Sequence, residues 1–322
     1  MQAIVFDHYG PPEGLKLLDV PTPVPKAGEV LIKVHAAALN AADWHLLRAD
    51  PFLVRLMCGL FAPRDKRLGA DVAGVVQAAG PGVTRFKVGD EVFGCLPIGA
   101  LGSYAELACA PERVLALKPA GLSFAQAAAV PLASLTALQA LRDACGLQAG
   151  ERALINGASG GVGCFAVQIA KAMGAEVTAV CSSRNVELAR SIGADHVIDY
   201  SQTDFTQQAE RYDVILAANG YHPLTAYKRV LTPKGRYAMT GGAGKQMAES
   251  IFLGPWHSER NGRKFKTGGM KANVADLEYL RGLMETGKLV PVIDRSYTLQ
   301  QVPEAIAYLE EGHARGKIVI TV

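Results

Sequence analysis

The stretch that decides the fold is ALINGASGGVG, residues Ala153–Gly163. It opens with an apolar run typical of a buried strand, and four of its last seven residues are glycine. Glycine loses more conformational freedom on folding than any other residue, so a turn this poor in side chains has an entropic cost. The stretch therefore indicates a place where the backbone itself must come close to another group.

A glycine-rich turn between a strand and a helix is suited to binding a diphosphate. The first helical turn offers unpaired N–H groups and partial positive charge, and the missing side chains let a phosphate approach. Ala158 replaces the first glycine of the G-x-G-x-x-G fingerprint, and Gly157 precedes it. Gly160 would permit backbone contact, and Gly163 would permit close packing of helix on sheet. An ordinary tight strand–helix turn is the alternative interpretation. The dinucleotide interpretation predicts cofactor contacts from Ala158, Ser159, Gly160, Gly161, Val162 and Gly163.

The end of the next strand predicts which dinucleotide binds. NAD sites usually carry an acidic residue there, ~20 residues after the turn, to bind the ribose 2′-hydroxyl. Here the chain reads CSSRN, with no acid. Hydroxyl, amide and guanidinium groups can surround a 2′-phosphate, and Arg184 would give charge-assisted hydrogen bonds. A solvated Arg184 is the alternative. We expect NADP(H), held here by Cys181, Ser182, Arg184 and Asn185.

The composition of the 322-residue chain is that of a globular protein, with 49% hydrophobic and 20% charged residues. Its length suits roughly two domains. A net charge of +3 is too small to indicate a nucleic-acid or membrane partner, and no uninterrupted apolar run reaches the ~18 residues of a membrane span. No signal-peptide pattern is visible at the N-terminus, so we expect a cytoplasmic protein. Six scattered cysteines without a C-x-x-C pair indicate neither disulfides nor a zinc knuckle.

Short β-type runs bounded by Pro and Gly fill the first part of the chain, notably Glu29–Leu39, Asp71–Gly80 and Gly89–Gly94. They predict a mostly β, partly barrel-like domain. The sequence pattern changes from β-type to helical near residue 121. Ser123 is a candidate helix cap there, and Pro131 is a candidate start of a second helix.

Strands and helices then alternate strictly, which predicts a doubly wound parallel sheet of Rossmann type. The expected elements are RALIN, GVGCFAVQIAKAMG, EVTAVC, NVELARSIG, HVIDY, YDVILAAN, a helix at Leu224–Val230, and GRYAMTG. This alternation is expected to stop near Asn261, after which two amphipathic helices (Val274–Leu289 and Val302–His313) and the closing strand GKIVITV return to the first domain. The predicted boundaries are 1–121, 122–262 and 263–322.

Several motifs together are specific to one family. The chain resembles the medium-chain dehydrogenase/reductases, in their zinc-free quinone oxidoreductase branch, close to the mitochondrial reticulon-interacting reductases. The matching stretches are AGEVLIKVHAAALNAADW, GADVAGVV, VGDEVFG, GSYAELA, PLASLTALQAL, NGASGGVG, GADHVIDY and GKIVITV. The resemblance implies a GroES-like catalytic domain beside the Rossmann domain, a small-molecule substrate and a homodimer.

The same resemblance indicates that no metal is bound. Zinc-dependent members carry a Cys where this chain has Asn40, and a G-H-E triplet where it has Gly69–Asp71. Only Cys95 and Cys109 lie in the region of the family's four-Cys structural loop. Without a Lewis acid, alcohol oxidation lacks a means of stabilising the alkoxide. NADPH-dependent hydride transfer to a quinone or an α,β-unsaturated carbonyl compound is therefore favoured. The alternatives are a metal-free carbonyl reductase or alcohol dehydrogenase, and an NADPH-binding sensor or partner protein with little turnover.

Three residues are the catalytic candidates. The amide of Asn40 can reach ribose, nicotinamide or substrate, and Asp43 and His45 follow within one helical turn. His45 can donate a proton near neutral pH. The alternatives are a turn residue for Asn40 and a surface or satisfied core histidine for His45, while Tyr104 suits either the core or a cleft.

Further cofactor contacts are implied by the resemblance or by position. Thr136 and Tyr200 match family cofactor positions, and Asn219, Thr240 and Gly241 follow later strands at the edge where doubly wound sheets bind ligands. Lys317 lies near a family cofactor position, although a lysine in a terminal strand is usually exposed.

One segment, Arg48–Arg67, has apolar residues at roughly helical spacing: Phe52, Leu53, Leu56, Met57, Leu60 and Phe61. It predicts an apolar pocket wall or lid, or equally a plain packing helix. An apolar pocket would suit quinones or lipid-derived enones.

Overall fold

The computed structural model describes residues 1–242, 244–260 and 262–322. The chain divides into two compact units. The β-rich unit comprises Met1–Leu132, Ala272–Glu285 and Pro291–Val322. The parallel-sheet unit comprises Ala133–Lys271 and Thr286–Val290.

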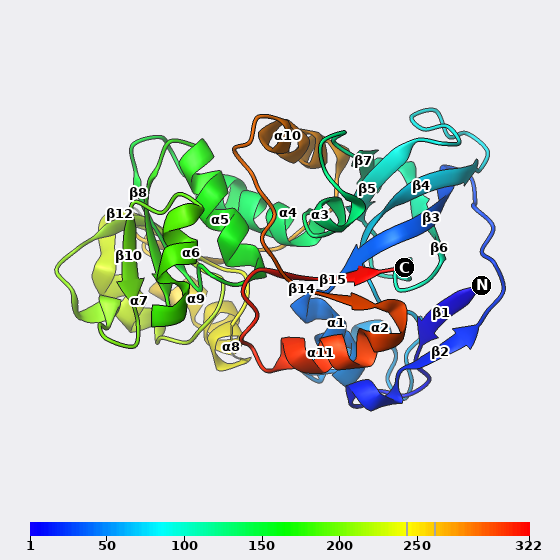
Figure 1. The fold of residues 1–322 in the computed structure, drawn as a ribbon. Helices are drawn as coiled ribbons and strands as arrows, with labels where there is room; N and C mark the ends of the chain where they lie inside the picture. Colours follow the sequence, from blue (N-terminus) through cyan, green and yellow to red (C-terminus); the bar gives the residue numbers. More distant parts are fainter. Residues whose placement is uncertain (243, 261) are drawn as a thin grey trace. The chain divides into compact units, whose positions relative to one another are not determined.

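The parallel-sheet unit has the expected doubly wound topology (Figure 1). Its six strands lie in the order β10-β9-β8-β11-β12-β13, and every pair is parallel. Counted from β8, this order is 3-2-1-4-5-6, the arrangement of dinucleotide-binding folds, and it reverses between β8 and β11. The strands are β8 (Arg152–Asn156), β9 (Glu176–Cys181), β10 (His196–Asp199), β11 (Tyr212–Ala217), β12 (Leu231–Met239) and β13 (Lys264–Thr267).

Helices in this unit follow the strands as expected, with two additions. They are α4 (Pro131–Gln139, which starts in the β-rich unit), α5 (Gly161–Ala172), α6 (Val186–Ser191), α7 (Leu224–Val230), α8 (Gly244–Phe252) and α9 (Gly254–His257). The expectation that the alternation stops near Asn261 is wrong, since β13 extends the sheet beside β12. Asn261 itself lies outside the described residues. The sequence of β13, KFKT, is too short and too charged to signal a strand.

The β-rich unit is built on one seven-stranded sheet in the order β14-β15-β3-β4-β5-β7, with β6 paired to β3. Its strands are β3 (Glu29–Ala38), β4 (Asp71–Ala79), β5 (Glu91–Cys95), β6 (Leu107–Pro111), β7 (Leu115–Leu117), β14 (Ile293–Thr298) and β15 (Lys317–Thr321). A separate hairpin joins β1 (Gln2–Val5) to β2 (Lys16–Asp19). The described strand pairs do not close into a barrel. The final strand β15 pairs antiparallel with β3, so the C-terminal segment completes the N-terminal sheet.

Helices of the β-rich unit are α1 (Ala41–Arg48), α2 (Leu53–Cys58), α3 (Phe124–Ala128), α10 (Val274–Glu285) and α11 (Val302–Glu310). The predicted cap is confirmed at α3, where Ser123 Oγ accepts a hydrogen bond from the Gln126 amide. The helical run Phe124–Ala144 is long and apolar enough to cross a membrane by those two criteria alone. Because 78% of its apolar window is buried in the structure, it fits a core helix equally well.

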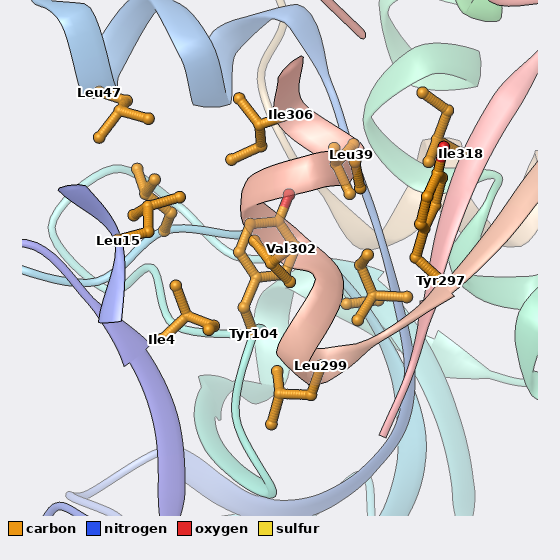
Figure 2. Packing of buried hydrophobic residues seen from close by; sticks show 14 of the residues in the cluster. Ile4, Leu15, Leu39, Leu47, Tyr104, Tyr297, Leu299, Val302, Ile306 and Ile318 are labelled. Carbon is orange, nitrogen blue, oxygen red and sulfur yellow. The ribbon is translucent and has the colours of Figure 1, made fainter. Parts of the chain in front are cut away.

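The core of the β-rich unit fixes the C-terminal strand against the end of β3. Figure 2 shows the cluster, which includes Leu39, Tyr104, Val302, Ile306 and Ile318. Each of these side chains is at most 2% exposed. Burying an aliphatic side chain of this size is worth about 1.5–3 kcal/mol. Leu39 and Ile318 are the chain neighbours of Asn40 and Lys317, so this packing also positions two candidate site residues.

Candidate functional site

The glycine turn follows β8 and is attached to β9. The amides of Gly157 and Ala158 both donate to Val180 O, at 3.2 and 3.0 Å. Gly157 has φ +84°, a conformation that favours glycine. A Cβ on Gly163 would lie 2.1 Å from Gly157 O. Any residue other than glycine at this position would therefore push the start of α5 away from the turn.

Gly160 is different, because the fold has room for a side chain there. A Cβ on Gly160 would meet Gly157 O at 3.6 Å, which is ordinary van der Waals contact, and its φ of −81° suits any residue. The described structure thus gives no packing reason for glycine at this position. A ligand that approaches the backbone at the start of α5 would give one.

Asn185 connects the glycine turn to the end of β9. It is 4% exposed, and its Nδ2 donates to Ser159 Oγ at 2.8 Å and to Ser182 Oγ at 3.3 Å. Its Oδ1 is buried and accepts no hydrogen bond from any described residue. A buried oxygen of this kind needs a donor, such as a ribose hydroxyl or water. The structure therefore brings Ser159, Ser182 and Asn185 together, as a shared cofactor site requires.

The predicted 2′-phosphate position lies on an exposed turn. Arg184 is exposed, and Tyr200 is 59% exposed with its amide bonded to Cys181 O. Cys181 is buried, and burial raises the pKa of its thiol to about 11, so the thiol stays neutral near pH 7. The acid Asp199 at the end of β10 is also part of this surface: it accepts a hydrogen bond from Ser183 Oγ at 2.6 Å. That bond lowers the pKa of Asp199 and keeps the carboxylate charged.

The remaining cofactor candidates lie after β11 and β12, apart from Thr136, which is buried in α4. The Asn219 amide donates to Asn156 O, at the end of β8. Thr240 has a buried Oγ1 without a partner among the described residues. A Cβ on Gly241 would lie 2.6 Å from Ala218 O, so the fold itself accounts for this glycine. Direct cofactor contact stays a prediction for all four residues.

A second polar cluster, which we call the lysine network, lies in the β-rich unit. Lys317 Nζ donates to Leu39 O at 2.8 Å, to Asn40 Oδ1, and to Asp71 Oδ2 at 3.4 Å. Asn40 Nδ2 donates to the same Asp71 oxygen at 2.9 Å. Lys317 is only 3% exposed, so the expectation of an exposed terminal-strand lysine is wrong. The antiparallel pairing of β15 with β3 carries its side chain into the interior.

Asp71 is a further member of this network that the sequence does not single out, because it stands alone at the start of a mostly apolar strand. It is fully buried, and its Oδ1 accepts the Leu132 amide at 2.8 Å. Burial raises the pKa of its carboxyl group, and the nearby Lys317 ammonium opposes that rise.

The lysine network does not suit a zinc ion. The oxygens of Asn40 and Asp71 that could bind a cation already accept hydrogen bonds from Lys317, a cation itself. Throughout residues 1–242, 244–260 and 262–322, no three His, Cys, Asp or Glu side chains come together as a metal site.

Asp43 lies beside the lysine network, in the first turn of α1. Its Oδ2 accepts the Asn40 amide and the Tyr104 hydroxyl, both at 2.8 Å, and its Oδ1 accepts the Gly69 amide at 3.1 Å. These bonds make it a positioning residue for the start of α1. Burial nevertheless raises the pKa of Asp43 to about 6, because desolvation of the carboxylate outweighs the hydrogen bonds.

We expect Asp43 to titrate near pH 6 in the folded protein. Because the folded protein binds this proton more tightly than the unfolded chain does, protonation of Asp43 stabilises the fold. This contribution to the free energy of unfolding, on the order of 3 kcal/mol, is fully present below the ordinary pKa of 3.8 and is lost as pH rises through 6. Tyr104→Phe should raise the midpoint further, because the tyrosine hydroxyl bond favours the charged carboxylate. The measurement is a ¹³C NMR titration of the Asp43 carboxyl carbon in both proteins. A midpoint at or below 4 in the unmodified protein would contradict this assignment.

His45 is half-buried and lies two residues after Asp43 in α1. Its Nδ1 lies 2.6 Å from Asp50 O, and its ring packs on Trp44 with centroids 3.6 Å apart. Because a carbonyl can only accept, Nδ1 carries a proton and Nε2 becomes a proton donor only in the imidazolium form. The geometry fixes the ring, and its catalytic role stays a prediction.

The segment Arg48–Arg67 does not pack as a helix in the core, so that alternative is wrong. Its six apolar side chains are 45–89% exposed, and only a short helix, α2, forms. Met57 does line a cavity of about 320 Å³. That this segment forms the wall of a substrate pocket, or a lid over one, stays a prediction.

Comparisons with known proteins find matches for the sequences of both units. Residues 26–120 match the family model for the alcohol dehydrogenase GroES-like domain, and residues 192–320 match that for zinc-binding dehydrogenase. A chloroplast envelope quinone oxidoreductase homolog of Arabidopsis thaliana is 35% identical over 99% of this chain and 98% of its own. A mitochondrial NAD(P)H oxidoreductase of Bos taurus is 34% identical over 100% and 89%. The quinone oxidoreductase structure from Coxiella burnetii is 33% identical, with a TM-score of 0.88 over 100% of this chain and 99% of its own.

A GroES-like sheet and a parallel sheet of strand order 3-2-1-4-5-6 define an oxidoreductase of the dehydrogenase/reductase class. The chain belongs to the medium-chain dehydrogenase/reductase superfamily, in its quinone oxidoreductase-like branch. The bonds from Lys317 to Asn40 and Asp71 in the lysine network fit the zinc-free part of that branch.

Proposed function

We propose that this protein is a zinc-independent enzyme that uses NADPH to reduce a quinone or an α,β-unsaturated carbonyl compound. The observation that carries the proposal is the lysine network, in which Lys317 occupies the oxygens that a cation would need. Without a Lewis acid, the negative charge that develops in the reaction must be stabilised by the substrate itself. Quinones and conjugated carbonyl compounds spread that charge over their own π system, whereas a simple alkoxide does not.

The parallel-sheet unit supplies the residues that fit a dinucleotide. The backbone at Gly160 and the start of α5 would hold the pyrophosphate. The partnerless oxygens of Asn185 and Thr240 would accept hydrogen bonds from hydroxyl or amide groups of the cofactor. When bound, NADPH supplies a hydride. The chain's own contribution is to hold the reactants in place and to exclude water.

The β-rich unit supplies a proton source. His45 Nε2 can release a proton when the ring is charged, and the Nδ1 bond to Asp50 O keeps the ring oriented. Tyr104 is unsuited to this role, because it is buried and its hydroxyl is donated to Asp43.

A panel assay tests the proposal. We expect rapid NADPH oxidation with a small quinone, slower oxidation with an enone, and no reduction of NADP⁺ by primary or secondary alcohols. The rates should be unchanged by 1,10-phenanthroline, and elemental analysis should find no stoichiometric zinc. Alcohol oxidation or tightly held zinc would favour a dehydrogenase, and tight NADPH binding without turnover on any acceptor would favour a sensor.

The choice of NADPH rests on Arg184. Asp199 adds negative charge next to this surface, so a 2′-phosphate needs a cation to offset it. Arg184→Ala should therefore raise the KM for NADPH at least tenfold more than the KM for NADH. The matched control is Arg190→Ala, which removes an exposed arginine paired with Glu187. Steady-state kinetics with both cofactors provide the measurement, and equal effects on the two would remove Arg184 from the phosphate site.

We also propose that the protein forms a homodimer and is located in the cytoplasm. The dimer rests on the family resemblance, and light scattering tests it directly: a mass of twice the 34.1 kDa chain is expected. A single-chain mass at micromolar concentration would contradict it.

A further inference from the structure

The β-rich unit contains a cavity whose wall is formed in part by α2 and the segment that follows it. It has a volume of about 320 Å³, and its apolar wall includes Phe6, Leu46, Leu68 and Leu101. Three of these side chains are at most 6% exposed and belong to the core or its edge, so the wall is preformed. This volume is at the small end of ligand pockets and has room for one or two fused rings.

The polar side of the cavity contains a carboxylate oxygen without a partner. Asp65 Oδ1 accepts the backbone amide and the Nε of Arg67, both at 3.2 Å. Asp65 Oδ2 is buried and accepts no hydrogen bond from any residue that the structure describes. The Asp65 side chain is 24% exposed and pairs with Arg67, whereas its Oδ2 atom is shielded from solvent and needs a donor from a ligand or from a bound water.

Of the two substrate classes proposed above, only a quinone gains such a donor when it is reduced. A quinone carries carbonyl oxygens, which only accept hydrogen bonds. Addition of a hydride and a proton converts it to a hydroquinone, which carries two O–H donors. The guanidinium groups of Arg64 and Arg67, which also line the cavity, can donate to either form, whereas the unpartnered Asp65 oxygen can bind only the O–H of the reduced form.

We propose that this cavity binds the hydroquinone product, with its ring against Phe6, Leu68 and Leu101 and one O–H donated to Asp65 Oδ2. The identity of the ligand rests on the proposed function. The binding itself requires no turnover, so the two can be tested separately.

The test is equilibrium binding under anaerobic conditions without NADPH. Naphthalene-1,4-diol is the probe, 1,4-naphthoquinone is the oxidised form, and 1,4-dimethoxynaphthalene is a ligand of similar shape without donors. We expect the diol to bind at least tenfold more tightly than either of the others. Asp65→Asn should abolish this preference, because its Oδ1 can still accept from Arg67 while an N–H donor replaces Oδ2. Asp7→Asn is the matched control, since Asp7 pairs with Lys66 on the surface and does not line the cavity.

Equal affinities for the diol and its dimethyl ether would overturn the inference, as would a preference that survives Asp65→Asn. That second result would mean that the diol donates to a group other than Asp65. If Asp65→Asn fails to fold, Ile98→Trp replaces it, because Ile98 lines the cavity yet is 65% exposed, and the larger ring should weaken diol binding. A protein that binds the diol more tightly than the other two ligands but never oxidises NADPH would contradict the proposed function and still support this binding site.

Discussion

Lys317→Met is expected to destabilise the folded protein by about 3–5 kcal/mol, the cost of leaving a buried charge without its partner. Lys317 and Asp71 are 3% and 0% exposed as side chains, and the ammonium also satisfies Leu39 O and Asn40 Oδ1. Methionine keeps the length of the side chain but provides no donor. The Asp71 carboxylate would then remain in an apolar interior without a counter-charge.

Urea unfolding at pH 7 measures this effect, with two comparisons. The double variant Lys317→Met/Asp71→Asn should recover a large part of the lost free energy, because neither charge then stays buried alone. Lys66→Met removes an exposed lysine from its pair with Asp7, whose side chains are 60% and 50% exposed, and should cost no more than about 1 kcal/mol. A Lys317→Met loss as small as that of Lys66→Met would show that the network is hydrated and its ion pair unimportant.

The burial of Lys317 illustrates what local sequence patterns cannot predict. The strand GKIVITV was expected from its β-branched residues, and β15 forms there. Its first residue contacts Asn40, 277 positions earlier in the chain, only because β15 pairs with β3. Burial that depends on so distant a pairing leaves no periodic signal near residue 317.

The parallel-sheet unit was predictable for the opposite reason. Each of its first five strands is a short apolar run next to a helix or turn signal, and the helix at Leu224–Val230 begins and ends as expected. A packing helix was an incorrect prediction for the segment Arg48–Arg67, because apolar residues at helical spacing normally indicate a buried helix face. Here Phe52 and Phe61 are 64% and 89% exposed, and the segment provides one cavity wall instead.

Two of the four glycines in the turn, Gly160 and Gly163, distinguish the requirements of the fold from those of the cofactor. Gly163→Ala should destabilise the protein by about 1–3 kcal/mol, because its Cβ would lie 2.1 Å from a backbone oxygen of the same turn. Gly160→Ala should cost less than about 1 kcal/mol, since its Cβ has room and only the N-cap preference of glycine over alanine is lost.

Cofactor binding should respond to both changes. We expect Gly160→Ala to weaken NADPH binding at least tenfold, about 1.4 kcal/mol, because the added methyl group stands where the pyrophosphate approaches the first turn of α5. Gly163→Ala should weaken it too, since the displaced turn can no longer present its amides. Fluorescence titration with NADPH, together with thermal unfolding of each variant, separates the two cases. A stable Gly160→Ala protein that binds NADPH with unchanged affinity would show that no phosphate approaches this backbone, and the glycine turn would lose its assignment as a dinucleotide site.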